Sequence, residues 1–400
     1  MVRRVAIVAG EASGDLLGAS LVSAVQQRFP GTRFEGIAGP RMLAAGASTR
    51  VPMEKLSVRG YVEALRSLPE LLRIRANLGA QLEAERPDLF IGVDAPDFNL
   101  GLATRLKRAG IPTVQYVSPS IWAWRPGRIK AIGRAVDLVL TIFPFEAAIY
   151  EKAGIAAAYV GHPLADQIPL VQDRDEARAQ LRLGSQATAV ALLPGSRRGE
   201  LEAHADLFID TALRLAQRRP GTRFFVPLAT RETRDYFESR LYARDARGLD
   251  LTILFGHARL ALQAADGALV ASGTATLEGA LARCPMVIAY KVPALTYRLM
   301  MRRALLPWVG LPNILAGEFI VPELLQEHAT PENLEQALAN WLDHRTARER
   351  LLARYEAIHA SLRCGNDERV AQALAPWLSN GATDASGKAT LPLEYAPTKG

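Results

Sequence analysis

Apolar and polar positions alternate in the first part of the chain with two periods, one typical of buried strands and one of amphipathic helices. Residues 4–9 form an apolar run, a glycine-containing turn follows, and Leu17, Leu21, Val25 and Phe29 then recur at a spacing of four. Such a run favours a strand, and the spacing of four favours a helix. The same pattern predicts strands at 89–93, 113–117 and 136–142, and helices around 71–82, 102–109, 127–133 and 145–153. Strands alternating with helices indicate a mainly parallel sheet covered by helices on both faces.

The pattern is interrupted after residue 164 and then begins again. Residues 165–175 contain Pro169 and several acids and are interpreted as a linker or hinge. Strands are then predicted at 188–193, 223–227, 251–255, 267–270 and 286–289, with helices within 201–217, 233–242, 258–264 and 275–282. Because 400 residues exceed what one hydrophobic core usually serves, two α/β domains are expected, at 1–164 and 176–343. Helices are expected at 331–342, 344–362 and 367–378, and a disordered tail at 379–400.

Composition narrows the class of protein without identifying it. With 49% hydrophobic and 22% charged residues the chain is globular, and no apolar run reaches the roughly 18–20 residues of a membrane span. The apolar N-terminal run is too short for a signal sequence, so a cytoplasmic location is expected. The net charge of +7 is dispersed, with no nucleic-acid-reading module, which favours phosphorylated substrates or an anionic membrane surface over nucleic acid. Cys284 and Cys364 provide no disulfide framework.

Two carboxylates follow the predicted strand 89–93, namely Asp94 and Asp97 on either side of Pro96. Ligands of parallel α/β sheets bind at the carboxyl ends of strands, and a carboxylate held there is a candidate general base. The competing interpretation is that Asp97 or Asn99 only caps the next helix, which is expected to begin near Leu100.

Two matched loops in the second predicted domain are suited to bind an anion. Each passes from a strand into a helix and combines glycine with hydroxyl side chains, and the first also carries paired arginines. Backbone amides at a helix N-terminus and the planar donor fork of arginine both favour phosphate. Serine and threonine are also ordinary helix caps, so each loop alone is a weak signal. Together they predict a nucleotide-diphosphate site with Ser196, Arg197 and Arg198 in one loop and Ser272, Gly273, Thr274, Thr276 and Glu278 in the other.

Several other patterns of catalytic or metal sites are missing from the sequence. There is no P-loop, no Gly-x-Gly-x-x-Gly fingerprint, no Gly-x-Ser-x-Gly elbow and no His-x-x-x-His spacing. Asp173 and Asp175 have a spacing that some metal-dependent sugar transferases use. They directly precede a predicted helix, so acidic residues in its first turn explain them better. No metal and no cofactor are predicted.

Two amphiphilic stretches remain. Residues 115–128 place Trp122, Trp124 and Arg125 next to a strand end, where they could contact a phosphorylated, partly apolar substrate or simply form a packed loop. Residues 295–312 interleave Arg298 and Arg302 with bulky apolar side chains. This second stretch fits a helix on an anionic membrane surface, and an ordinary interdomain helix is the alternative.

With these motifs in place, the chain closely resembles the lipid-A-disaccharide synthases over residues 5–378. The resemblance rests on many motifs in the same order, which makes it highly specific. They are AGEASGD (9–15), GVDAPDFN (92–99), YVSPSIWAWR (116–125), FPFE (143–146), VGHPL (160–164), LPGSR (193–197), SGTATLE (272–278) and LPN (311–313).

The resemblance implies an inverting GT-B glycosyltransferase with two Rossmann-like doubly wound domains facing a cleft. It implies transfer of diacylglucosamine from UDP-2,3-diacylglucosamine to 2,3-diacylglucosamine 1-phosphate (lipid X), with a new β-1,6 linkage and release of UDP. The pathway would be lipid A biosynthesis in Gram-negative bacteria, at the cytoplasmic face of the inner membrane. A homodimer is possible, and helices at 344–378 are expected to pack on the first domain of the same chain or of a partner.

The resemblance also assigns roles to residues. Asp94 would take the proton of the acceptor hydroxyl, with Glu11 and Asp97 as the other candidates for the base. The second domain would hold UDP through Arg197 or Arg198 and Glu278, with Asn313 near the donor. The first domain would take the acceptor, with contacts from Ser13, Ser118, Trp122, Trp124 and Arg125. Arg298 and Arg302 of the second domain are further candidates for contact with the acceptor or with lipid. The rival interpretations are a muramyl-lipid glucosaminyltransferase, a UDP-sugar 2-epimerase and a non-catalytic UDP-sugar sensor at the membrane surface.

Overall fold

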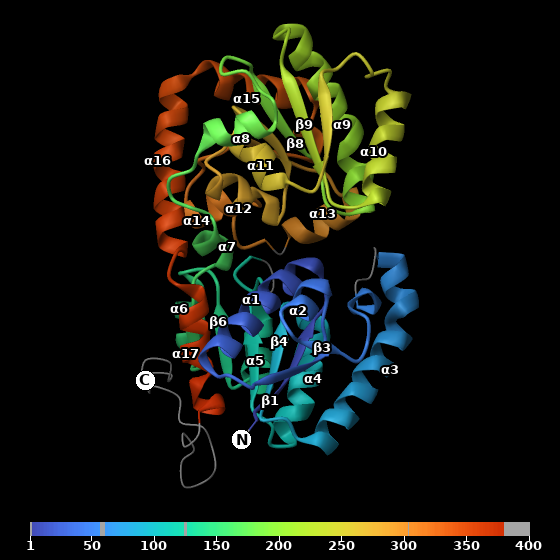
Figure 1. Ribbon diagram of the computed structural model, residues 1–400. Helices are drawn as coiled ribbons and strands as arrows, with labels where there is room; N and C mark the ends of the chain where they lie inside the picture. The colour runs from blue at the N-terminus through green and yellow to red at the C-terminus, as the bar shows by residue number, and fades with distance from the viewer. Residues whose placement is uncertain (1, 57–60, 124–125, 303, 380–400) are drawn as a thin grey trace. The chain divides into compact units, whose positions relative to one another are not determined.

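Two parallel sheets organise the chain, one in each of two structural units (Figure 1). The computed structural model describes residues 2–56, 61–123, 126–302 and 304–379. Unit 1 comprises Met1–Asp166 and Leu362–Gly400, and unit 2 comprises Gln167–Ser361. The chain therefore leaves unit 1 once, builds unit 2 and returns.

The sheet of unit 1 has seven strands in the order β3-β2-β1-β4-β5-β6-β7, all paired in parallel. Its order reverses between β1 and β4, as in doubly wound nucleotide-binding folds. The central strands are buried on both faces, which explains why they read as continuous apolar runs in the sequence. The strands are β1 (Arg4–Ala9), β2 (Arg33–Ile37), β3 (Ser48–Thr49), β4 (Leu89–Val93), β5 (Thr113–Tyr116), β6 (Leu138–Thr141) and β7 (Ala157–Tyr159).

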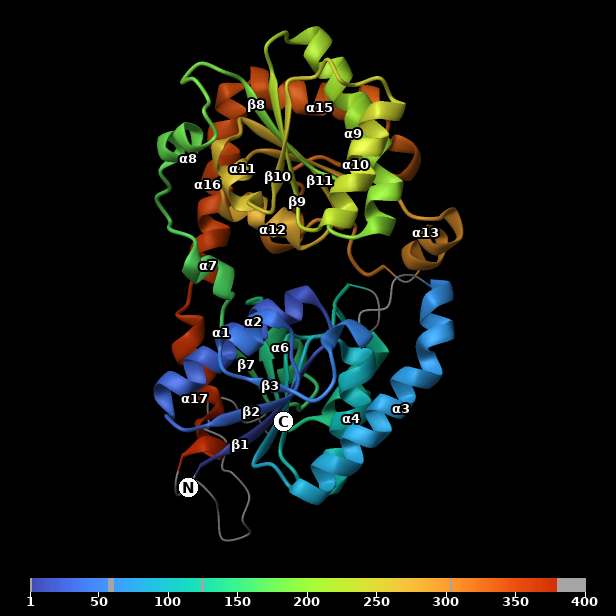
Figure 2. The ribbon, with the colours of Figure 1, turned by 45° about the vertical axis from the view of Figure 1, so that its right-hand side comes forward.

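Helices cover this sheet in two groups. Helix α1 packs against α2 and α17, whereas α4 packs between α3 and α5. Figure 2 shows α3 beside α4 and, away from them, α1 beside α17. The helices and short 3₁₀ turns of unit 1 are α1 (Ala12–Arg28), α2 (Pro40–Ala44), η1 (Met53–Lys55), α3 (Tyr61–Glu85), α4 (Pro96–Arg108), η2 (Pro126–Arg128), α5 (Ile129–Ala135), α6 (Glu146–Glu151), α7 (Pro163–Gln167) and α17 (Asn366–Leu378).

Helix α17 belongs to unit 1 through polar contacts as well as packing. The backbone amides of Gly365 and Asn366 donate to the Asp166 carboxylate at 3.1 and 2.6 Å. The Asn366 side chain donates to the carbonyl oxygens of Val160 and Gly161 at 3.3 and 3.0 Å. The two places where the chain leaves and re-enters unit 1 are thus hydrogen-bonded to each other.

The sheet of unit 2 repeats the same winding, with six parallel strands in the order β10-β9-β8-β11-β12-β13. Its order reverses between β8 and β11. The strands are β8 (Ala189–Leu193), β9 (Arg223–Leu228), β10 (Leu251–Phe255), β11 (Gly267–Ala271), β12 (Met286–Tyr290) and β13 (Glu323–Leu325).

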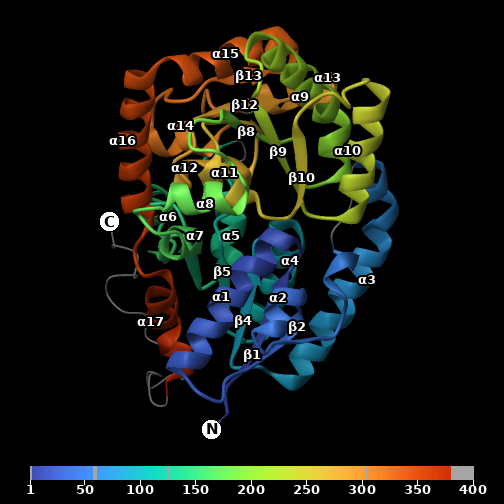
Figure 3. The same ribbon diagram turned by 45° about the horizontal axis from the view of Figure 1, so that its top comes forward.

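Helices of unit 2 likewise form two groups. Helix α9 packs against α10 and α15, as Figure 3 shows for α9 and α10, and α11 packs against α8 and α12. The elements are α8 (Arg174–Gln180), α9 (Arg198–Arg218), α10 (Arg231–Ala243), α11 (Ala258–Ala264), α12 (Thr274–Leu281), α13 (Ala294–Met301), α14 (Leu311–Ala316), η3 (Gln326–His328), α15 (Pro331–Asp343) and α16 (Arg345–Leu362). Asp173, in the predicted linker, caps α8 by accepting from the Glu176 amide at 2.8 Å. This contact agrees with the helix-start interpretation of Asp173 and Asp175.

Two features differ from the elements predicted from the sequence, and one prediction is not tested. Strands β2, β3, β7 and β13 were not expected, because they are short or carry polar residues and lack a buried apolar run. Helix α4 begins at Pro96 and not near Leu100. The tail from 380 lies outside the described residues.

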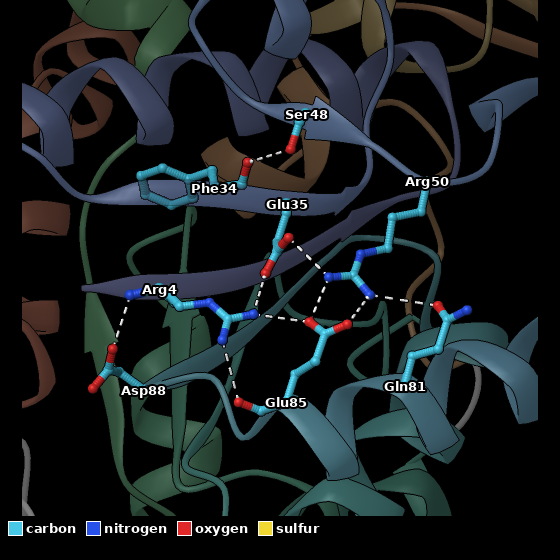
Figure 4. Close-up of polar contacts among 8 residues, drawn as sticks. All are labelled: Arg4, Phe34, Glu35, Ser48, Arg50, Gln81, Glu85 and Asp88. Atoms are coloured by element: carbon cyan, nitrogen blue, oxygen red, sulfur yellow. Dashed lines mark hydrogen bonds and ion pairs between the residues drawn. The ribbon is translucent and has the colours of Figure 1, made fainter. Parts of the chain in front are cut away.

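Unit 1 carries an ion-pair network between its sheet and the end of α3, which Figure 4 shows in close-up. Arg4 of β1 and Arg50 both contact the carboxylates of Glu35 and Glu85, at 2.5–2.9 Å. The network joins β1, β2 and the residue after β3 to α3, and none of its members is a candidate site residue. No helix in the described part of the chain is long and apolar enough to cross a membrane.

Candidate active site

The candidate residues of unit 1 meet at the point where its strand order reverses. Strands β1 and β4 are neighbours, with Ala9 opposite Val93 in the register. The loops that leave them begin with Gly10 and Asp94, so the first turn of α1 and the Asp94 turn lie side by side. Crevices of this kind, at the carboxyl ends of strands that diverge in topology, are where doubly wound sheets bind ligands.

Glycines allow these two loops to approach closely. A Cβ atom on Gly10 would lie 2.7 Å from the Cβ of Ala95, and one on Gly14 would lie 3.7 Å from the Cβ of Asp94. Glu11 is the N-cap residue of α1 and is partly buried, and Ser13 lies in the first turn of that helix. The structure therefore brings Glu11 and Ser13 into the same loop cluster as Asp94.

The backbone of Asp94 is held in an unusual conformation. Asp94 and the next residue, Ala95, have φ angles of +51° and +40°. The Asp94 amide donates to the Tyr116 carbonyl at 2.9 Å, and its own carbonyl accepts from Asn99 Nδ2 at 2.9 Å and Gln115 Nε2 at 3.0 Å. Two successive left-handed residues without glycine are costly and persist only where surrounding contacts hold them, which is a common feature of active sites.

Asn99 and Gln115 are the supports of this turn. Both side chains are buried, and their amide oxygens have no hydrogen-bond partner among the described residues. Gly92 makes room for them, since a Cβ there would lie 2.9 Å from both Asn99 Cβ and Gln115 Oε1. The idea that Asn99 caps the following helix is thus wrong: its side chain donates to carbonyl groups at the strand ends, and no side chain caps α4. Gln115 had no role in the sequence-based hypothesis.

Asp97 has a different environment from Asp94. Its side chain is 80% exposed and forms an ion pair with Arg128, the last residue of η2. It makes no capping hydrogen bond at the start of α4. Asp94, in contrast, is partly buried. The two carboxylates of residues 94–97 therefore differ in burial and in their partners.

The loop after β5 carries the acceptor-side candidates Ser118 and Trp122. The Ser118 hydroxyl is buried and shares a 2.7 Å hydrogen bond with the Tyr150 hydroxyl. The indole Nε1 of Trp122 donates to Glu146 Oε1 at 2.8 Å. Sequence analysis noted Glu146 only as part of a motif and gave it no role, although its position just after a strand was a usable signal. Trp124 and Arg125 lie outside the described residues.

In unit 2 the loops after β8 and β11 are also neighbours at a reversal of strand order, with Leu193 opposite Val270. In the first of them, Glu200 Oε2 accepts from the backbone amides of Ser196 at 2.7 Å and Arg197 at 3.3 Å. Gly195, with φ at +135°, permits this, because a Cβ there would lie 2.4 Å from Glu200 Cβ. Two amides that the sequence suggested for a bound anion are therefore occupied by the protein's own carboxylate.

The paired arginines of this loop have different surroundings. The Arg198 guanidinium lies 3.8 Å from the centre of the Tyr236 ring, and its Nε donates to Glu202 at 2.9 Å. Arg198 is thus engaged by α9 and α10. Arg197 is the N-cap residue of α9, next to the turn that enters the helix.

In the loop after β11, some side chains hydrogen-bond to a neighbouring segment and other residues are exposed to solvent. Ser272 Oγ donates to the Val309 carbonyl at 3.1 Å, and the buried Thr276 hydroxyl accepts from the Leu311 amide at 3.3 Å. These hydroxyls hold the segment before α14. Gly273 and Thr274, in contrast, are exposed at the start of α12, where no side-chain cap is present, and Glu278 is partly buried in the same helix.

Asn313 is fully buried inside unit 2. Its Nδ2 donates to the Val321 carbonyl and to Glu323 Oε1 at 2.9 and 2.7 Å, and its Oδ1 accepts from the amides of Ile320 and Val321. The side chain thus organises the segment between α14 and β13. A place close to the donor remains a prediction for Asn313, and these contacts make an indirect role the simpler one.

His204 was missed by sequence reasoning, because a lone histidine within a helix carries no motif. Its Nδ1 lies 2.7 Å from the Glu200 carbonyl oxygen, and its Nε2 accepts from the Lys291 amide at 3.0 Å. Burial lowers the pKa of the imidazole, which keeps the ring neutral with its proton on Nδ1. His204 therefore ties the first turn of α9 to the end of β12.

Arg298 and Arg302 lie on and just after α13 and are exposed, as are the apolar side chains of Met301 and Leu305. Among the described residues, no group of three or more His, Cys, Asp or Glu side chains is placed to hold a metal ion. The chemistry available to the described site is thus that of carboxylates in unit 1 and of arginines, hydroxyls and a helix N-terminus in unit 2.

Two doubly wound units, each with ligand-type loops at its reversal point, are the architecture of the GT-B fold class. A UDP-GlcNAc 2-epimerase from Neisseria meningitidis, solved bound to UDP-GlcNAc, shares the fold with a TM-score of 0.62 at 11% identity, covering 92% of this chain and 98% of that one. The family model for lipid-A-disaccharide synthetase matches residues 5–375. Lipid-A-disaccharide synthases of Aromatoleum aromaticum and Methylobacillus flagellatus are 54% and 51% identical over 379 and 374 residues, covering 95% and 94% of this chain and 97% and 99% of theirs. The chain belongs to the lipid-A-disaccharide synthase family.

Proposed function

We propose that this protein transfers 2,3-diacylglucosamine from its UDP derivative to 2,3-diacylglucosamine 1-phosphate, forming a β-1,6-linked disaccharide 1-phosphate and UDP. The observation that carries the proposal is the distribution of residue types over the two reversal points. Acidic residues gather at the one in unit 1, whereas arginines, hydroxyls and an uncapped helix start gather at the one in unit 2. Membership of the family supports the same reaction.

Unit 2 is assigned the donor. Arg197 and Arg198 are the two candidates for the contact with the diphosphate, and the Arg198 guanidinium also contacts Tyr236 and Glu202. The exposed residues Gly273 and Thr274 open α12, whose N-terminus favours negative charge. Positive groups at this position stabilise the diphosphate as it leaves, which is where charge develops in the transition state. Glu278 is assigned the ribose hydroxyls.

Unit 1 is assigned the acceptor and the base. Asp94 takes the proton from the acceptor 6-hydroxyl as the oxygen attacks the anomeric carbon of the donor from the face opposite to the UDP, which inverts that carbon. The hydrogen bonds that hold the Asp94 backbone support this role, because a general base must be fixed within hydrogen-bonding reach of the proton that it removes. Asp97, exposed and paired with Arg128, is a weaker candidate, and Glu11 is the nearest alternative in the loop cluster.

The acylated substrates require a membrane or a micelle, and we assign the contact with an anionic membrane surface to the segment around α13. Arg298, Arg302, Met301 and Leu305 combine exposed charge with exposed apolar area there. The proposed site of the reaction in the cell is the cytoplasmic face of the inner membrane.

The experiment that tests the proposed function is incubation of the purified protein with radiolabelled UDP-2,3-diacylglucosamine, with and without 2,3-diacylglucosamine 1-phosphate. The proposal predicts a labelled disaccharide 1-phosphate and one equivalent of UDP, only when both substrates are present. Conversion of the donor alone to an epimer would contradict it, and so would binding of the donor with no product.

A further inference from the structure

Glu146 is a buried carboxylate to which none of the roles above is assigned. It opens α6 directly after the end of β6 and is only 1% exposed. Burial raises the pKa of its carboxyl group to about 7. A carboxylate in such a place is costly unless several donors surround it, so the identity of those donors shows what it holds in place.

Its donors come from two sources. Oε2 accepts from the backbone amides of Ile142 and Phe143 at 3.2 and 3.0 Å, which are local contacts at the end of β6. Oε1 accepts from the indole Nε1 of Trp122 at 2.8 Å, which lies 24 residues away in sequence. Glu146 thus joins the loop after β5 to the loop after β6.

Aromatic rings fix the indole in the remaining directions. Trp122 meets Phe145 edge to face, with ring centres 5.2 Å apart and an interplanar angle of 88°, and it meets Phe143 at 6.2 Å and 80°. The rings can slide along one another, whereas the hydrogen bond to Glu146 fixes the position of the indole nitrogen. The carboxylate therefore fixes the position of the Trp122 loop.

The other titratable groups packed about this cluster are neutral near pH 7. Burial raises the pKa of the Tyr150 hydroxyl, which bonds to Ser118, and lowers the pKa of His162, which stacks on Phe143, to about 4. Among the described residues of the cluster, Glu146 is thus the group whose charge changes in this range.

We propose that Glu146 is a positioning residue. It fixes the Trp122 loop, residues 118–123, so that the acceptor sugar phosphate is bound in the correct position. The assignment of an acceptor to this loop rests on the proposed function, whereas the hydrogen bond to Trp122 does not. A carboxylate is required because it accepts from the indole and from two backbone amides at once. A glutamine has one oxygen and would turn its amide N–H groups toward some of these donors.

The test combines kinetics with the indole ¹H–¹⁵N spectrum of the whole protein. Glu146→Gln should raise the KM for the acceptor by about 10- to 100-fold, as expected for loss of a charge-assisted hydrogen bond, with the donor KM unchanged. The Trp122 indole signal, identified by its loss in Trp122→Phe, should titrate near pH 7 in the wild-type protein and move upfield in Glu146→Gln. The indole of Trp341, which donates to the Met286 carbonyl in unit 2, should do neither.

Glu151→Gln, at the exposed end of the same helix, is the matched control and should behave as the wild type. If Glu146→Gln does not fold, Trp122→Phe still decides, because it keeps a ring and removes only the indole donor; it should show the same rise in acceptor KM. A wild-type acceptor KM in Trp122→Phe would overturn the proposal, and so would a Trp122 indole signal that is unchanged in Glu146→Gln. If the wild-type protein makes no disaccharide, the proposed function fails while the spectrum still tests the bond to Glu146.

Discussion

At the scale of single residues, the Asp94 turn shows how the fold holds a strained conformation. Neither Asp94 nor Ala95 is a glycine, yet both have positive φ angles. Aspartate tolerates this region better than most residues, and the donors from Asn99 and Gln115 offset the rest of the cost. None of these contacts is visible in the sequence, because Gln115 lies 21 residues away and on another strand.

The contact between Gly10 and Ala95 gives a prediction for this turn. Gly10→Ala would place two Cβ atoms 2.7 Å apart, so we expect a loss of about 1–3 kcal/mol of stability together with reduced turnover. Ala95→Gly removes the opposing Cβ and suits the positive φ, so the double variant should recover much of both losses. Chemical denaturation and activity assays measure the two effects.

Gly248→Ala is the control for the glycine change itself, because a Cβ there would meet nothing within 4 Å. A double variant no better than Gly10→Ala would show that the Ala95 contact is not what requires a glycine at position 10.

At the scale of elements, the candidate site and the ion-pair network of unit 1 use different residues. The candidate loops leave the carboxyl ends of strands, whereas Arg4, Glu35, Arg50 and Glu85 join β1, β2 and the residue after β3 to α3 (Figure 4). The network can therefore be altered without touching the site.

Glu85→Gln should lower the free energy of unfolding by about 1 kcal/mol at pH 7, a modest value because these side chains are partly exposed. Hydrogen bonds from Arg50 lower the pKa of Glu85 from its ordinary 4.5. The contribution is therefore complete above about pH 4.5 and is lost as the pH falls through the lowered pKa. Denaturation curves at several pH values measure this dependence.

Glu83→Gln provides the comparison, because Glu83 lies on the same helix and pairs with Arg105 alone. Its effect should be smaller than that of Glu85→Gln, and neither variant should change turnover. Equal effects of the two changes would contradict a special role for the network.

At the scale of the whole molecule, the sequence predicted the two α/β units and the strand ends that carry chemistry, because buried parallel strands leave strong apolar runs. Edge strands such as β3, β7 and β13 were not predicted, because they are too short to show an alternation of apolar and polar residues. Among the candidate site residues, Asp94 and the loops of unit 2 were proposed from motif and position. The remaining features depend on contacts between residues distant in sequence or on loop geometry. They are the hydrogen bonds from the Ser196 and Arg197 amides to Glu200, the burial of Asn313, and the supporting contacts of Gln115, Glu146 and His204.

Membrane association is a further prediction for the whole molecule. Reversing the charge of Arg298 and Arg302 together should weaken binding to phosphatidylglycerol vesicles by at least about 30-fold. Each lost basic residue costs about 1 kcal/mol at an anionic surface, and each acid that replaces it adds repulsion. Binding to phosphatidylcholine vesicles should change little, and sedimentation with vesicles measures both.

The matched control reverses Arg231 and Arg234, two exposed arginines on α10, which alters the net charge equally. Equal losses in the two double variants would mean that total charge, and not the α13 segment, determines binding.

The central claim is that Asp94 is the base of a glycosyl transfer, and turnover of Asp94→Asn with saturating substrates tests it most directly. Asparagine has the same shape and tolerates a positive φ, so fold and UDP binding should be kept while kcat falls by about 10²- to 10⁴-fold. Asp97→Asn, assayed in parallel, should retain most of the wild-type rate. Near-normal turnover of a folded Asp94→Asn variant would contradict the account and leave Glu11 or Asp97 as the base.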